Sequence, residues 1–543
     1  MASTSTSPSP ADSAAPLHTA LGVVLLGIAA LGVGLVAAPY KAFDLDRFFV
    51  PKELVLHVAA LCIAFPIVRR SRRVPFTGVD VLLALYLALS VVSALFAANA
   101  WLATRALAVT WSSLLLFWSA TAFTAGSPRR RRTITGLLAV AVVAVAVSAL
   151  VQAYGADSTF FSTNRAPGGT LGNRNFVAHL AAIITPLLIV TAVGARRWLA
   201  TAAAALGLAA VSAILVLSRT RAAWIALAAC VIVLLPGVWR ARRKWRVPGM
   251  RRRLALIGCV AAAAVGAAVF APNALEWRSK SPYLDTMKNV ADYKGGSGRG
   301  RLLQYENSIR LALHHPLLGV GPGNWAVAYP AIVPASDPSL DDQTRMTANP
   351  WPSSDWMAFV SERGWIATGC LALAMLMLLS DAAGQLLSAT AFDDYLRGLA
   401  LGGTVIATVI VGLFDAVLLL PAPALIVFAA LGALRTPPVR RAFAPPAALR
   451  AALAAAVVAV GVGAAARSAF MLRAMRDYEH DAVVTAARED PGSYRIQMRL
   501  ADDAAARGRC DLVRVHAGAA RALFPYAPAP KRRLAECSRS APR

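Results

Sequence analysis

Long apolar runs recur along most of the chain and are separated by short polar segments. The clearest runs are each about 17–25 residues long and cover residues 21–38, 79–98, 134–154, 176–194, 254–271 and 356–379. As a helix, a run of this length matches the hydrocarbon thickness of a lipid bilayer. The pattern predicts an all-α fold, a polytopic transmembrane helical bundle of about 12–13 spans.

Polar regions within and around these runs set the expected domain organisation. The first 15 residues are rich in Ser, Pro and Ala and are expected to be disordered. Transmembrane helices follow over 16–271, then one large loop over 272–355, further helices over 356–466 and a polar tail over 467–543. The N-terminus lacks the basic region of a cleaved signal peptide, so the first span is expected to remain as an anchor.

The polar tail shows helical periodicity. Its prolines Pro491 and Pro525 are about 34 residues apart, the period of tetratricopeptide (TPR) helix pairs. We predict a small TPR-like helical domain, with a plain helical hairpin packed on the membrane domain as the alternative. Cys510 and Cys537 lie in this tail and can pair if it faces an oxidising compartment. The other cysteines fall within apolar runs and are interpreted as small buried hydrophobic residues: Cys62, Cys230, Cys259 and Cys370.

The charge pattern predicts the orientation of the bundle. Lys and Arg number 55 against 28 Asp and Glu, which gives a formal net charge of +27. In a soluble protein this excess would indicate nucleic acid. Here the basic clusters fall in alternate short loops, at 69–73, 129–132, 196–197, 239–253 and 435–441. The positive-inside rule places these loops and the N-terminus in the cytoplasm, and the large loop and the tail outside it. No nucleic-acid partner is expected.

Two arginines, Arg219 and Arg221 in the segment LSRTRAAW, stand at the edge of an apolar run on the predicted outer face. Charged side chains are costly in a membrane and positive charges are rare on its outer side. A guanidinium fork binds phosphate through two parallel hydrogen bonds. Both residues are therefore candidates for binding an anionic headgroup or a diphosphate, and snorkelling to lipid phosphates is the alternative.

A second basic group lies in the large loop. Arg299 and Arg301 open a helical pattern that ends at Pro316. His314 and His315 at the end of this pattern are candidate acid–base groups. Capping of helix carbonyls is the alternative, and we favour it for His314.

A glycine-rich segment, GVGPGN, follows this predicted helix. Glycines permit backbone conformations closed to other residues and a close approach to a ligand. The segment lacks the GK[ST] end of a phosphate P-loop and the βαβ context of a dinucleotide site. Its candidate substrate-binding residues are Gly319, Gly321, Gly323 and Asn324.

Carboxylates and amides supply the remaining candidates. Asp355 and Glu362 are seven residues apart, so they share one face of a helix, where either can act as a general base. Pairing with an arginine is the alternative, and we favour it for Glu362. Asn173 and Asn175 lead from an outer loop into an apolar run. They can cap that helix, or they can hydrogen-bond a sugar. No metal-ligand spacing of Cys and His is present, and no cofactor or metal is expected.

Taken together and in this order, these segments resemble the O-antigen ligase/polymerase superfamily. The resemblance covers about 153–434 and is carried by GTLGNRNFVA, SRTRAAW, HHPLLGVGPGN and SERGWIATG. It does not choose between ligases, polymerases and protein O-glycosyltransferases.

The resemblance implies inverting, metal-independent glycosyl transfer at the outer, periplasmic face of a bacterial inner membrane. The donor would be a glycan on undecaprenyl diphosphate, and the acceptor a hydroxyl of lipid A core, another glycan or a protein. The family's diphosphate-binding arginines correspond to Arg221 and Arg301. In one place the chain departs from the family, since ligases usually carry His just before the Asp at the start of the post-loop span, whereas Ser353 and Ser354 precede Asp355 here. The base would then be Asp355, Glu362 or His315, or the reaction needs little help from a base.

Two other functions compete with glycosyl transfer. A lipid-linked glycan transporter or flippase would need charged residues along the middle of several spans, whereas these charges gather on the outer side. A non-catalytic envelope scaffold that recruits partners through the tail is the third candidate.

Overall fold

The computed structural model describes residues 10–241, 244, 248–277, 279, 281–288, 296–436 and 442–539, which contain twenty α-helices. Those before the large loop are α1 (Pro10–Leu35), α2 (Asp46–Arg70), α3 (Gly78–Leu95), α4 (Ala100–Thr124), α5 (Pro128–Ala153), α6 (Arg174–Gly194), α7 (Trp198–Leu217), α8 (Arg221–Ala241) and α9 (Met250–Phe270). The large loop carries α10 (Pro282–Lys288), α11 (Gly296–His314) and α12 (Trp325–Ala328). After it come α13 (Asp355–Ser388), α14 (Phe392–Phe414), α15 (Pro421–Leu434), α16 (Ala447–Glu479), α17 (Val483–Glu489), α18 (Tyr494–Ala506), α19 (Cys510–Leu523) and α20 (Pro528–Arg539).

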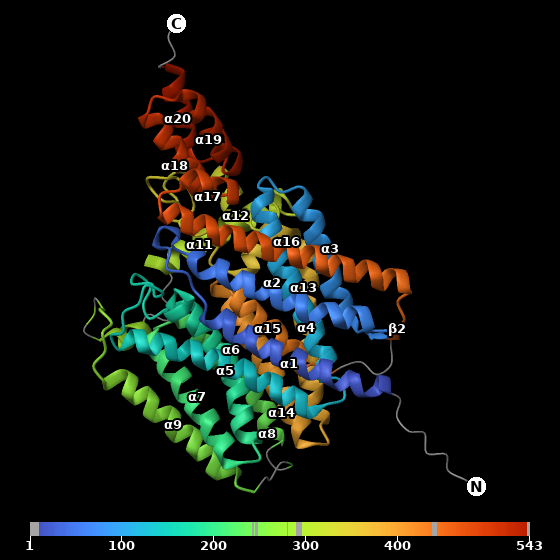
Figure 1. Cartoon of the computed structure of the whole chain (residues 1–543). Coiled ribbons are helices and arrows are strands. Elements are labelled where there is room, and N and C mark those ends of the chain that lie inside the picture. Colours follow the sequence, from blue (N-terminus) through green and yellow to red (C-terminus); the bar gives the residue numbers. More distant parts are fainter. Residues whose placement is uncertain are drawn as a thin grey trace.

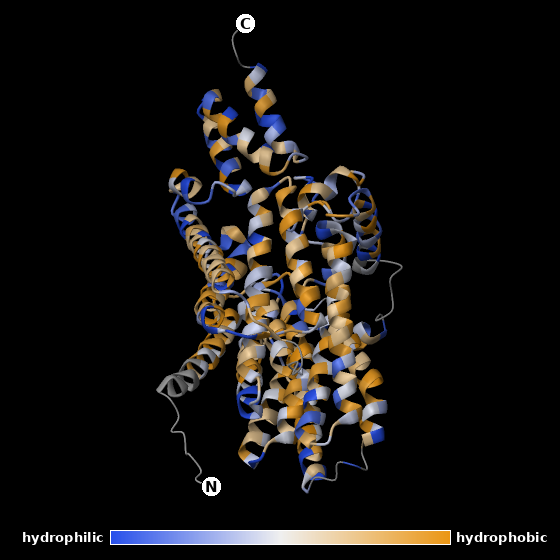
Figure 2. Cartoon of the chain, turned by 90° about the vertical axis from the view of Figure 1, so that its right-hand side faces the viewer, coloured by the Kyte–Doolittle hydropathy of each residue, from blue (hydrophilic) through white to orange (hydrophobic). Residues whose placement is uncertain are grey.

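Within the described residues, eleven helices are long and apolar enough to cross a bilayer. They are α2 to α9, α13, α14 and α16, and two shorter apolar helices, Thr19–Leu35 in α1 and Pro421–Leu434 (α15), accompany them. A helix satisfies its own backbone hydrogen bonds, which is why helices can span lipid. Figure 2 shows apolar residues along the bundle helices, and Figure 1 shows the helices packed side by side. The predicted polytopic helical bundle is confirmed.

Loops that carry the basic clusters meet at one end of the bundle. The short strands β1 (Val74–Pro75) and β2 (Ala442–Phe443) pair antiparallel there. At the same end, Arg132 forms an ion pair with Asp393, and Arg253 Nη1 donates to the Val193 carbonyl at 2.7 Å. The large loop and the tail lie at the opposite end. In Figure 1, α16 runs from β2 at the basic end to α17 at the end that carries the tail. The bundle thus has one strongly basic end and one end with the long polar segments.

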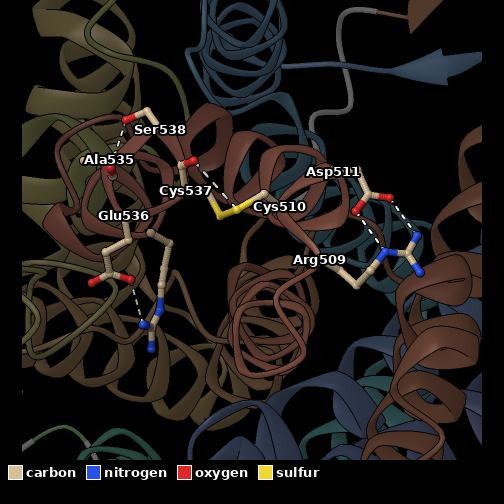
Figure 3. The surroundings of a disulfide bond; sticks show 8 residues. Arg509, Cys510, Asp511, Ala535, Glu536, Cys537 and Ser538 are labelled. Carbon is tan, nitrogen blue, oxygen red and sulfur yellow. Dashed lines mark hydrogen bonds and ion pairs between the residues drawn. A yellow bond between two sulfur atoms is a disulfide. The ribbon is translucent and has the colours of Figure 1, made fainter. Parts of the chain in front are cut away.

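The tail is helical and is tied to the end of the bundle that carries the large loop. The Ala42 N–H donates to Glu479 Oε1 at 2.8 Å, and Asn99 Nδ2 donates to the Leu523 carbonyl at 3.0 Å. A disulfide joins Cys510 at the start of α19 to Cys537 in α20 (Figure 3). The helical hairpins of the tail fit both a TPR-like pair and a plain hairpin.

Three details differ from the expectations. The first helix already begins at Pro10, so residues 10–15 are helical, while residues 1–9 of the expected disordered segment lie outside the described residues. The boundary expected between the last span and the tail, at residues 466–467, lies inside α16, which continues without a break to Glu479. Cys62 and Cys259 are exposed on the helix surface rather than buried, because an apolar run of uniform composition does not show which face packs inward.

Candidate functional site

Asn175, in the first turn of α6, links three elements of the chain. The preceding Asn173 is the N-cap of α6, and its side chain accepts a 3.0 Å hydrogen bond from the Asn175 N–H. The Asn175 side chain donates from Nδ2 to Asp415 Oδ2 at 3.2 Å. It accepts from Thr220 Oγ1 at 3.2 Å. The start of α6, the α7–α8 turn and the segment after α14 therefore meet at this amide.

The α7–α8 turn presents two arginines beside this junction. Arg219 adopts a left-handed backbone conformation, with φ of 55°. Its Nε donates to Thr286 Oγ1 of α10 at 2.8 Å, and its guanidinium lies 4.7 Å from the Trp277 ring centroid. Burial lowers the pKa of Arg219, and the nearby Asp285 carboxylate opposes this shift. Arg221 follows Thr220 and is the first residue of α8.

A further arginine, Arg174 at the start of α6, also lies against Trp277, with its guanidinium 5.2 Å from the ring centroid. The indole face attracts both cations, which share one side chain as a platform. Neither Arg174 nor Arg219 therefore points freely into the lipid. The snorkelling alternative for Arg219 does not describe this arrangement, because Thr286 and Trp277 hold its guanidinium against the loop that contains α10.

Helix α11 brings Arg301 to the same end of the bundle. One turn further along α11, the Tyr305 hydroxyl donates to the carbonyls of Ser353 at 2.8 Å and Leu413 at 2.5 Å. Gln304 Oε1 accepts from the Ser353 N–H at 2.5 Å. These bonds hold α11 against the start of α13 and the end of α14. Arg301 is half-buried and Arg299 is exposed.

His179 lies one turn below Asn175 on α6 and is 1% exposed. The charged groups that act on its imidazole are Asp415 and Arg301. Among the described residues, neither ring nitrogen has a hydrogen-bond partner. Asn175 is thus bonded to Asp415 and to Thr220, the neighbour of Arg221, while Asp415 and Arg301 both act on His179. We call Asn175, His179, Arg221, Arg301 and Asp415 the arginine site.

Asp355 is engaged as a structural acceptor. It is 1% exposed, and its carboxylate accepts from the N–H groups of Val417 and Leu418, each at 2.9 Å, and of Leu419 at 3.4 Å. These bonds fasten the segment between α14 and α15 to the start of α13. The adjacent Ser354 is the N-cap of α13.

Glu362 is engaged in the same way at another place on α13. Its carboxylate accepts from the N–H groups of Gly323 at 2.8 Å and Trp325 at 3.2 Å. The favoured alternative of an arginine partner is therefore replaced by two backbone amides. Sequence spacing identified Glu362 as a carboxylate at a membrane edge, but it could not show which backbone groups would reach it.

The glycine-rich segment packs against α13 at the point where that helix is broken. Gly319, Gly321 and Gly323 have the expected positive φ angles, of 66°, 99° and 70°. A Cβ on Gly319 would lie 2.3 Å from the Glu362 carbonyl carbon, and the Asn324 side chain accepts from the Asn99 N–H at 2.7 Å. The close approach that these glycines allow is therefore to protein backbone.

His314 and His315 lie at the far end of α11 and are exposed. Fourteen residues separate His315 from Arg301, which corresponds to about 21 Å along a helix. The structure therefore does not bring His315 into the arginine site.

Two members of the arginine site, His179 and Asp415, were missed from the sequence. His179 lies inside an apolar run, and Asp415 closes another in GLFDAVLLL. An ionisable residue in or beside a span is a signal for function, and that signal was present for both. Within the described ranges, no three His, Cys, Asp or Glu side chains are grouped as metal ligands would be.

Part of the chain that carries this site matches a known protein family. Residues 206–372 match the family model described as O-antigen ligase. The chain carries an O-antigen ligase domain. This domain contains Arg219, Arg221, Arg301 and Glu362, whereas Asn175, His179 and Asp415 lie outside the matched residues. No curated protein matches the chain. The matched domain and the membrane helices support a multi-pass membrane protein with a function of O-antigen ligase/polymerase type in envelope polysaccharide synthesis.

Proposed function

We propose that the chain is an inverting, metal-independent glycosyltransferase that moves a glycan from undecaprenyl diphosphate to an acceptor hydroxyl. The observation that carries the proposal is that α8 begins with Arg221 at the end of the bundle where α11 carries Arg301. Thr220, next to Arg221, donates a hydrogen bond to Asn175, and Arg301 is one of the two charged groups that act on His179, one turn further along α6. Two guanidinium groups on separate elements suit a diphosphate, which offers oxygens on two phosphorus atoms.

The arginines would stabilise the charge that develops as the carrier leaves. The acceptor oxygen attacks the anomeric carbon from the face opposite the diphosphate, and the bond from carbon to the diphosphate oxygen breaks. The electron pair of that bond goes to the diphosphate, where Arg221 and Arg301 stabilise it. Such stabilisation is usually the largest contribution to catalysis. Arg219, and Arg299 on the exposed start of α11, would extend the anion-binding surface.

The placement of the site favours surface chemistry over transport. Asn175 is in the first turn of α6, Arg221 begins α8 and Asp415 follows the end of α14, so all three lie at one end of the bundle. A flippase would need a polar path through the middle of the spans. A non-catalytic scaffold would not need arginines from two distant segments at this one end of the bundle.

We place this end of the bundle on the periplasmic side of a bacterial inner membrane, with the N-terminus in the cytoplasm. The basic loops gather at the other end, as the positive-inside rule requires of the cytoplasmic side. The Cys510–Cys537 disulfide supports the same orientation, because disulfides persist in oxidising compartments. The acceptor is a hydroxyl of lipid A core, of a glycan or of a protein.

Membranes of the native host provide the test, because they contain both the donor and the acceptor, whatever the sugar and the acceptor are. In a strain that lacks its own copy, we expect Arg221→Ala and Arg301→Ala each to lower glycan transfer by about 10²- to 10³-fold. Arg310→Ala is the matched control, since Arg310 is exposed on α11 and paired with Glu306. If both site variants transfer glycan at the wild-type rate with normal expression, the proposed function is wrong. Purified chain with separate lipid A core, glycan and protein acceptors then identifies the product.

A further inference from the structure

We propose that Asp415 accepts the proton of the acceptor hydroxyl and that His179 is the positioning residue behind it. This inference rests on the proposed function and names the groups that activate the acceptor. The sequence had left that role to Asp355, Glu362 or His315. The structure engages the first two carboxylates with backbone amides and places His315 at the far end of α11.

Asp415 is the carboxylate that the structure offers to the arginine site. It is half-exposed, in contrast to the buried Asp355 and Glu362. Asn175 Nδ2 donates to its Oδ2 at 3.2 Å, and its own neighbour, the Ala416 N–H, donates to Oδ1 at 2.9 Å. Each oxygen therefore keeps a lone pair for a further donor. A sugar hydroxyl that reaches this carboxylate has a proton acceptor held in a defined orientation.

His179 lies one turn further along α6 than Asn175, which binds Asp415. The proposed function gives His179 no other role. Its imidazole is 1% exposed and, among the residues described, has no hydrogen-bond partner on either nitrogen, which is unfavourable for a buried polar group. Asp415 and Arg301 are the charged groups that act on it. Its ring N–H can donate to the Asp415 carboxylate when that group is ionised. Such a bond would orient the carboxylate for the hydroxyl.

The arrangement also accounts for the serine pair before Asp355. Ser353 uses its backbone carbonyl and N–H to bind Tyr305 and Gln304, and Ser354 caps α13. Neither serine can act as a base without a base of its own. The proton acceptor Asp415 would thus come from the segment after α14, and the positioning residue His179 from α6. The hydrogen bond from Asn175 to Asp415 already joins these two elements.

The proposed step is balanced as follows. The acceptor O–H bond breaks and its proton passes to an oxygen of Asp415, while the acceptor oxygen forms the new bond to the anomeric carbon. The bond from that carbon to the diphosphate breaks, and the diphosphate leaves with the electron pair. Asp415 afterwards returns its proton to solvent.

The titratable and charged groups around the Asp415–His179 pair come from three helices. His179 belongs to α6, Arg301 and Tyr305 belong to α11, and Asp355 belongs to α13. Loss of the His179 imidazole would leave the Asp415 carboxylate without the group that orients it, so transfer would fall while the carrier still binds.

The experiment measures glycan transfer in host membranes and the binding of undecaprenyl diphosphate to purified full-length chain by native mass spectrometry. We expect Asp415→Asn to lower transfer about 100-fold or more and to retain carrier binding. His179→Leu should lower transfer about tenfold, the equivalent of one hydrogen bond to a charged group. It should retain carrier binding, and His179→Gln should restore part of the transfer rate.

His57→Leu is the matched control, because His57 is also buried but bonds to Ser112 at 2.8 Å in another part of the bundle. We expect its transfer per folded protein to equal that of wild type. The inference is overturned if Asp415→Asn transfers at the wild-type rate, if it loses carrier binding, or if His179→Leu keeps the wild-type rate. If Arg221→Ala and Arg301→Ala also transfer normally, the proposed function fails as well, so the two failures are distinguishable.

Discussion

The Glu362 carboxylate accepts a 2.8 Å hydrogen bond from the backbone N–H of Gly323. The same carboxylate accepts from the Trp325 N–H, so one side chain satisfies both ends of the turn that leads into α12. Helix α13 is interrupted two residues later at Gly364, where φ is 79° and ψ is 171°. The glycine-rich segment enters this break, and the Trp365 N–H donates to the Pro316 carbonyl at 3.0 Å. The large loop is thereby joined to the membrane bundle.

The first prediction is that Glu362 stabilises this junction without taking part in transfer. Glu362→Ala leaves two backbone N–H groups without an acceptor, which should lower the free energy of unfolding by about 2–4 kcal/mol. Glu362→Gln keeps one acceptor oxygen and should lose less. Thermal unfolding in detergent measures the change, with glycan transfer normalised to folded protein. A Glu362→Gln variant that folds normally and transfers no glycan would assign the carboxylate a catalytic role.

The second prediction concerns the break in α13. Gly364→Ala should destabilise the chain by about 3 kcal/mol, because the residue has a positive φ and a Cβ would lie 2.2 Å from the Leu317 carbonyl oxygen. Gly369→Ala is the matched control in the same helix, since a Cβ there meets nothing within 4 Å. It should be neutral or stabilising by up to about 1 kcal/mol. Equal melting temperatures for the two variants would show that the break contributes nothing to stability.

The bundle could be predicted from the sequence because each span must be apolar over the full thickness of the bilayer. The alternation of basic loops likewise separates the two ends, whichever helices pack against each other. Because each span is apolar on all sides, its sequence does not show which face packs against other helices. For this reason Cys62 and Cys259 were wrongly expected to be buried. Which helices are neighbours is equally absent from the pattern.

The candidate site was predictable only in part, for a related reason. Arg221 stands out because arginine is rare beside apolar runs on the outer side, whereas Arg301, in the large loop, was given its role by the family resemblance. The partners of Asp355 and Glu362 are backbone amides from 62 and 39 residues away, which carry no side-chain signal. His179 and Asp415 join the site through Asn175 and α11, and no spacing along the chain relates these segments.

The third prediction concerns alkaline pH. Burial raises the pKa of Tyr329 in the large loop to about 12, because its phenolate would lose water. A raised folded-state pKa means that the stabilisation is fully present below the unfolded value near 10 and is lost as pH rises toward 12. Tyr329 should therefore contribute a loss of about 2 kcal/mol between pH 10 and 12. Melting temperatures at pH 9 and 11 should fall further in wild type than in Tyr329→Phe, and equal falls would contradict the assignment.

The last prediction concerns the disulfide in the tail, which closes a loop with a sequence separation of 27 (Figure 3). By chain entropy, a loop of this length stabilises the folded tail by about 3–4 kcal/mol. Cys510→Ser should therefore make α19 and α20 more susceptible to proteolysis, whereas Cys370→Ser, in the apolar part of α13, should not. Denatured wild-type chain should bind alkylating reagent at four cysteines without reductant and at six with it. Six labelled cysteines without reductant would show that the tail has not passed through an oxidising compartment, and would count against the periplasmic orientation of the arginine site.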